Sequence, residues 1–156
     1  MPASKPPARR SVPLIRRDTD YAFRAMVHLA CAPAGPVAAR ALSAAQAVPL
    51  SFSQKILRRL ARANLVAARM GPGGGFVLAR PAGRISMMDI VAAIQGPPLL
   101  NHCVREAAAC RRRRGCPVNP PLRKLQGQLD AFLAGHTLHD ILPAQGAQRR
   151  HHARSR

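Results

Sequence analysis

Residues 41–66 read ALSAAQAVPLSFSQKILRRLARANLV, and this stretch decides the fold prediction. A short helix is expected over 38–47 and a second over 52–63, with a break at Pro49 between them. Ser51 is expected to cap the second helix, which is apolar on one side and basic on the other. Two short helices joined by a tight turn, the second amphipathic and basic, predict a helix-turn-helix.

A β-hairpin is expected directly after this pair of helices. Residues 65–67 and 76–79 have strand character, and GPGGG at 71–75 supplies the glycines that a tight turn needs. A hairpin that follows a basic helix is typical of a wing. The fold class predicted is mainly α, a winged helix-turn-helix with a two-stranded wing and a long C-terminal dimerisation helix.

Helices are also predicted on both sides of this unit. The first covers 17–31, where residues 18–20 offer N-caps, and another opens at Ser86, which has a capping-box partner in Asp89, and ends at Gln95.

The long C-terminal helix is expected to begin at Asn119, as N-cap, and to end at Gly135, before a short turn capped by Thr137 and Asp140. Its apolar residues recur at spacings of three and four, which indicates a packing seam: Leu122, Leu125, Leu129 and Phe132.

The net charge of +19 is the first indication of function. Sixteen basic and six acidic residues lie between positions 18 and 142, so this part alone carries +10. Such a surface suits a polyanion, most simply nucleic acid, although an arginine-rich composition explains some of the excess. No paired carboxylates and no nucleophile with an oriented base are found, so an enzyme is not expected. The chain has no long apolar run and no signal-like N-terminus, and a cytoplasmic location is predicted.

Two sets of residues are candidates for contact with DNA. On the basic helix, those of the first turns are expected at base edges and the later arginines at phosphates; the alternative is a solvated charged face. These residues are Ser51, Ser53, Gln54 and Lys55, then Arg58, Arg59 and Arg62. On the wing, the candidates are Arg69, Gly73 and Gly74.

Three cysteines, Cys103, Cys110 and Cys116, fall within one short segment. Thiolates suit iron–sulfur clusters and zinc, and the gaps are wider than those of structural zinc knuckles, which favours a larger cluster. The alternatives are free thiols or a redox disulfide. His102 and Asp20, the latter from a partner subunit, are candidates for a fourth ligand.

Four segments resemble the IscR/NsrR family of iron–sulfur winged-helix regulators (the Rrf-two type), together spanning about residues 17–142. They are TDYAFRAMVHLA at 19–30, the stretch 41–66, GPGGGFVLARPAGRISMMDIVAAIQG at 71–96, and the three-cysteine segment ending in CPVNP with the long helix and HTLHDIL. The resemblance implies a homodimer that binds a double-stranded DNA operator. It also implies a [2Fe–2S] or [4Fe–4S] cluster that senses iron, nitric oxide or redox state.

Carried over, the same three cysteines become cluster ligands. Asp20 matches the acid that some nitric-oxide-sensing members use as fourth ligand. Two positions depart from the family: Asn119 stands where the IscR branch has a histidine ligand, and Met70 stands where the family usually has arginine. Alternative functions are a thiol–disulfide switch without a cluster and non-specific nucleic-acid binding. No membrane or small-molecule substrate is expected as a partner.

The predicted organisation has five parts. They are a disordered basic extension (1–16), a winged helix-turn-helix DNA-binding domain (17–96), a cysteine-containing cluster loop (97–119), a dimerisation helix with a short turn (120–142), and a disordered basic tail (143–156).

Overall fold

The computed structural model describes residues 13–32, 35–106, 110 and 115–143. The predictions of disorder for the N-terminal extension and the C-terminal tail therefore fall almost entirely outside the described residues. Within them, no helix is both long and apolar enough to cross a membrane.

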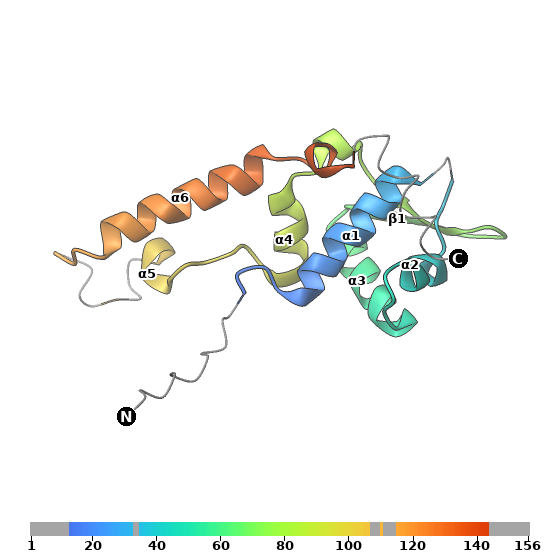
Figure 1. Cartoon of the computed structure of the whole chain (residues 1–156), viewed down its shortest axis with the longest axis horizontal. Helices are drawn as coiled ribbons and strands as arrows, with labels where there is room; N and C mark the ends of the chain where they lie inside the picture. The colour runs from blue at the N-terminus through green and yellow to red at the C-terminus, as the bar shows by residue number, and fades with distance from the viewer. Residues whose placement is uncertain (1–12, 33–34, 107–109, 111–114, 144–156) are drawn as a thin grey trace, which may run out of the picture.

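The predicted fold class is confirmed: the chain is mainly helical, with one two-stranded antiparallel sheet (Figure 1). The elements in chain order are α1 Arg17–Cys31, α2 Ala39–Ala45, α3 Leu50–Arg62, β1 Val66–Arg69, β2 Gly75–Leu78, the 3-10 turn η1 Ala82–Arg84, α4 Met87–Gln95, α5 His102–Arg105, α6 Asn119–Gly135 and the 3-10 turn η3 His139–Ile141.

The core lies where α1, α3 and α4 pack together, next to the hairpin. Met26, Leu60 and Ile90 contribute one fully buried side chain from each of these helices. Figure 1 shows α6 running away from this body, with α5 beside its N-terminal end. Beyond α6 the chain returns to the core, because Leu138 is fully buried and its N–H donates to the Ile85 carbonyl at 2.7 Å.

The two strands of the wing pair with each other, and β2 also pairs with the segment before α2. Phe76 of β2 exchanges two backbone hydrogen bonds with Val37, both 2.9 Å. A Cβ atom on Gly75 would lie 2.5 Å from the Val37 backbone, so only glycine permits this approach. The hairpin is thereby held at a fixed position beside the helix-turn-helix.

The predicted capping box at the start of α4 is confirmed. The Ser86 hydroxyl accepts from the Asp89 N–H, and the Asp89 carboxylate accepts from the Ser86 N–H, both at 3.0 Å. The contact expected between Thr137 and Asp140 is also present. The Thr137 N–H and hydroxyl both donate to that carboxylate and hold the pKa of Asp140 below its usual range.

Three other predicted caps are wrong. Helix α1 follows Arg16 and helix α3 follows Pro49, and neither helix has a side-chain cap at its N-terminus. Pro49 is extended, at φ −57° and ψ 142°, so the chain enters the helix before Ser51 is reached. Helix α6 has Val118 at its N-cap position, because the Asn119 side chain bonds elsewhere. The segment expected to be entirely loop also contains the short helix α5.

These caps give a stability prediction. Ser86→Ala removes a bonded cap and should lower the free energy of unfolding by about 1 kcal/mol. Ser51→Ala removes a hydroxyl that caps nothing and should change it by less than about 0.5 kcal/mol. Urea unfolding of the full chain measures both, and equal losses in the two variants would contradict this account of α3.

Candidate nucleic-acid interface and cysteine segment

Helix α3 has one face in the core and one face in solvent. Ile56, Leu57 and Leu60 are at most 4% exposed. The opposite face carries five exposed polar or basic residues from the predicted contact set: Ser51, Gln54, Lys55, Arg58 and Arg62. Because the apolar face is fixed against α1 and α4, these side chains project from a rigid helix.

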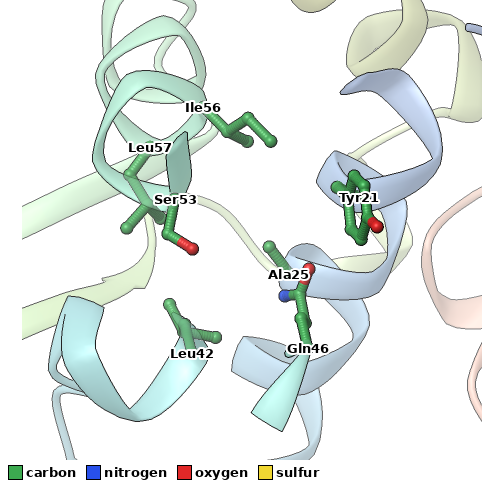
Figure 2. A pocket seen from close by; sticks show the side chains of 7 residues that line it. All are labelled: Tyr21, Ala25, Leu42, Gln46, Ser53, Ile56 and Leu57. Atoms are coloured by element: carbon green, nitrogen blue, oxygen red, sulfur yellow. The ribbon is translucent and has the colours of Figure 1, made fainter. Parts of the chain in front are cut away.

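Ser53 does not lie on this exposed face. It is 6% exposed and lines a small cavity with Tyr21, Leu42 and Gln46, as Figure 2 shows. The cavity is small, with room for about one water molecule. The structure therefore places Ser53 between α3, α1 and α2, where it supports the helix-turn-helix packing and is not available to a DNA base.

Arg59 is also engaged within the protein. Its Nη1 donates to the Ile94 carbonyl at 3.0 Å and to the Asp18 carboxylate at 3.3 Å. The sequence assigned Arg59 to DNA phosphates, but its guanidinium faces α4 and α1. Neither partner could be found from local spacing, because both lie more than 30 residues away in the chain.

The wing presents an exposed tip. Arg69 and Gly73 are exposed and Gly74 is half-buried, and the Gly74 N–H closes the turn on the Gly71 carbonyl at 2.9 Å. Met70 is 95% exposed at this tip. Wing and exposed α3 face thus form two separate protruding features of one rigid unit.

Helix α1 adds basic residues that the sequence analysis did not single out. Arg17 and Arg24 lie over the Tyr21 ring, at 5.6 and 5.7 Å from its centroid. Tyr21 packs edge-on against Phe52 at the start of α3, with ring centroids 5.4 Å apart. Aromatic contact thus joins two more cations to the N-terminal end of α3.

The three cysteines of the cysteine segment are all partly buried. Cys103 lies on α5, whose first residue, His102, is exposed. Among the described residues, which include all three of these cysteines, no three Cys, His, Asp or Glu side chains are grouped as a metal site. Asp20, the other candidate ligand, forms an ion pair with Arg24 at 2.9 Å.

One residue connects the first and third of these cysteines. The Asn119 amide donates to the Cys103 carbonyl at 3.0 Å, and its backbone N–H donates to the Cys116 carbonyl at 3.4 Å. Asn119 is only 7% exposed. The two ends of the cysteine segment are therefore held at the start of α6.

A polar stripe along α6 continues this attachment. Gln126, 4% exposed, accepts from the Leu100 N–H at 2.9 Å and donates to the Pro98 carbonyl at 3.0 Å. The Asp130 carboxylate accepts from the Gln126 amide at 2.9 Å, and both of its oxygens accept from the Arg105 guanidinium, at 2.9 and 3.0 Å. Positions 119, 126 and 130 share one face of α6, which the search for apolar periodicity overlooked.

The apolar seam of α6 lies largely in solvent in the single chain. Leu125 is 50% and Phe132 is 54% exposed, while Leu122 and Leu129 are half-buried.

A basic helix held by a helix-turn-helix, beside a rigid wing, defines a winged helix-turn-helix transcriptional regulator. The model of the Rrf2 family, described as iron-dependent transcriptional regulators, matches residues 15–144. This chain belongs to the Rrf2 family.

Named relatives agree with this assignment. The chain is similar to the HTH-type transcriptional regulator IscR of Salmonella paratyphi B, with 30% identity over 140 residues and 85% of each chain covered. Two solved structures share the fold. CymR, the global cysteine regulator of B. subtilis, gives a TM-score of 0.66 at 21% identity, over 84% of this chain and 96% of that one. The oxidized form of Staphylococcus aureus CymR gives 0.64 at 19%, over 83% and 96%.

The polar stripe gives a second stability prediction. Gln126→Ala leaves the Pro98 carbonyl and the Leu100 N–H without partners in a buried place, so unfolding free energy should fall by about 1–3 kcal/mol. Amide exchange at Leu100 should become faster. Gln128→Ala, at an exposed position of the same helix, serves as the control and should change neither quantity. Equal behaviour of the two variants would show that the stripe does not hold this segment.

Proposed function

We propose that this regulator binds a double-stranded DNA operator as a homodimer, and that an iron–sulfur cluster on Cys103, Cys110 and Cys116 controls the affinity. The observation that carries the proposal is the attachment of the first and third cysteines to Asn119, within a chain that matches a family of iron-dependent regulators.

The operator would be bound by α3 and the wing together. Helices of this kind fit the major groove, where Ser51, Gln54 and Lys55, all exposed, would meet base edges. Arg58 and Arg62, further along the exposed face, suit phosphates. Arg69 with the wing glycines at 73 and 74 would approach the sugar-phosphate chain beside that groove.

The donor types suit an iron–sulfur cluster, and binding one would have to draw together thiols that are not grouped in the described residues. Thiolates are the ligands that such clusters take, and Asn119 already brings two of the three cysteines to one helix end. The fourth ligand would be His102, exposed beside Cys103, or Asp20 of the partner subunit, which would first have to leave Arg24. When bound, the cluster supplies a centre whose charge and integrity depend on redox state and iron supply.

A thiol switch without a cluster is the second candidate. It is supported by the likeness to CymR, a regulator that has been crystallised in an oxidized form. Two of the three thiols would form the disulfide, and Asn119 holds the backbone of Cys103 and Cys116 at the start of α6. The disulfide would form with loss of two protons and two electrons to an oxidant such as hydrogen peroxide.

The exposed seam of α6 supports the homodimer. Leu125 and Phe132 are large apolar side chains, 50% and 54% exposed, and they lie two turns apart on the same stripe of α6. Packing two copies of this stripe together would remove the apolar area from water and place two α3 helices on one operator.

The cluster is tested by anaerobic purification and operator titration. The wild-type chain should be coloured, contain iron and acid-labile sulfide, and change operator affinity at least about fivefold when iron is removed. Cys103→Ser, Cys110→Ser and Cys116→Ser combined should abolish both the colour and the affinity change. Cys31→Ser, on α1, is the matched control and should keep both.

The alternatives give different results in the same experiment. A colourless protein with a Cys103–Cys110, Cys110–Cys116 or Cys103–Cys116 link in mass spectra after peroxide treatment would replace the cluster with the thiol switch. Equal affinity for operator and random DNA at about 0.15 M salt would leave only non-specific binding.

The homodimer is tested by introducing charged residues into the apolar seam of α6. Leu125→Glu and Phe132→Glu each place a carboxylate where an apolar contact is expected and should convert the dimer to a monomer. Analytical ultracentrifugation measures the mass, and operator affinity should fall with it. Ala131→Glu, at an exposed position on another side of α6, should leave the dimer intact. A wild-type chain that sediments as a monomer at micromolar concentration would contradict the proposal.

A further inference from the structure

We infer that Arg59 is a positioning residue, which couples helix α3 to the cysteine segment, and is not a contact to DNA phosphate. This inference rests on the proposed function, because it names the route by which the state of the thiols reaches the DNA-binding face.

The Arg59 side chain meets a site that is shared with a second arginine. The Ile94 carbonyl accepts from Arg59 at 3.0 Å and from Arg16 at 3.3 Å. The Asp18 carboxylate accepts from the same two arginines, at 3.3 and 3.2 Å. Ile94 lies in the last turn of α4, where carbonyls lack helix partners and carry partial negative charge. Two guanidiniums and one carboxylate therefore join α3, α1 and α4 at one point.

The next residue, Gln95, fixes the same end of α4 to the start of α1. Its Oε1 accepts from the Thr19 hydroxyl at 2.7 Å and from the Arg16 N–H at 2.9 Å. Its Nε2 donates to the Leu14 carbonyl at 3.0 Å. Thr19 is fully buried, so the junction reaches from the surface bonds of Arg16 and Leu14 into the core.

From this junction the chain leads directly to the first cysteine. Cys103 is nine residues after Ile94; of the connecting residues Pro98 and Leu100 are bonded to α6, and Arg105 is bonded to α6 two residues beyond Cys103. A displacement of Cys103 would thus be carried by a tethered segment to the end of α4. Of the polar residues of α3, Arg59 is the one with side-chain bonds to that end in the described structure.

The contacts of Arg59 also differ from those of Arg58 and Arg62, the other arginines of α3. Arg58 and Arg62 are exposed on the face proposed to meet DNA, whereas the Arg59 side chain is 36% exposed and donates to Asp18 and Ile94. Removing its guanidinium should leave the apolar face of α3 packed while loosening the link to α4. The predicted consequence is a loss of communication without loss of charge on the DNA face.

The experiment compares Arg59→Gln with Arg58→Gln and Arg62→Gln. Operator dissociation constants are measured at several salt concentrations for two states of each protein, cluster-loaded and cluster-free. Arg58→Gln and Arg62→Gln should weaken both states by similar factors and reduce the salt slope by about one. Arg59→Gln should keep the salt slope and bring the ratio of the two affinities to within about twofold of one. Arg59→Lys, which can still donate to both acceptors, should restore most of the ratio.

Two readouts keep the inference falsifiable. Amide exchange over residues 94–100 in the cluster-free protein should become faster in Arg59→Gln but not in Arg58→Gln. Asp18→Asn, which weakens the same junction from α1, should reduce the affinity ratio if Arg59→Gln is too unstable to study. An unchanged ratio together with a salt slope reduced by one would overturn the inference and return Arg59 to the phosphate contacts.

The failure of the proposed function gives a different result. If the wild-type affinity does not depend on the state of the thiols, the regulatory proposal fails. The salt slope and the amide exchange of Arg59→Gln would still decide whether Arg59 contacts DNA or the α4 end.

Discussion

The structure depends on the burial of one face of α3. A helix that presents charged side chains to a polyanion has to be held in place by its uncharged face. In α3 that face is formed by Ile56, Leu57 and Leu60. Each buried side chain of this size contributes about 1.5–3 kcal/mol. That contribution makes it possible for a chain with net charge +19 to keep its exposed arginines on a rigid surface. The wing is positioned by a different device, the backbone pairing of Phe76 with Val37 that only Gly75 allows.

Helix α6 is attached to the rest of the chain at both ends, by two kinds of interaction. At its C-terminal end the apolar Leu138 enters the same core that holds α3. At its N-terminal end Asn119 and Gln126 hold the cysteine segment by hydrogen bonds. Apolar packing tolerates small shifts poorly, while a hydrogen bond to a backbone carbonyl breaks or reforms as a unit. If the cysteines change chemically as we propose, the hydrogen bonds at the adjacent end of α6 are the contacts that would be rearranged.

Local patterns could be predicted from the sequence, and contacts between distant residues could not. The Ser86–Asp89 capping box has both partners within one helical turn, and it was predicted correctly. Ser53 and Arg59 have the residue types and helix positions of DNA contacts, yet their side chains meet partners from other helices. The bonds from Asn119 to Cys103 and from Gln126 to Pro98 span 16 and 28 residues. No spacing rule connects residues so far apart, so these contacts required the fold.

Asn119 shows why this difference matters for the chemistry. The resemblance drew attention to this position because related regulators place a histidine ligand there, which made the asparagine look like a missing ligand. In the structure the Asn119 side-chain amide donates to the Cys103 backbone carbonyl. A histidine that binds iron through one ring nitrogen could donate such a bond only through its second ring nitrogen. In this chain the side chain at position 119 is therefore engaged in holding the backbone of Cys103. The cluster that we propose would then take its fourth ligand from a residue other than Asn119, and the cysteines whose backbone Asn119 holds would be available to a disulfide as well as to iron.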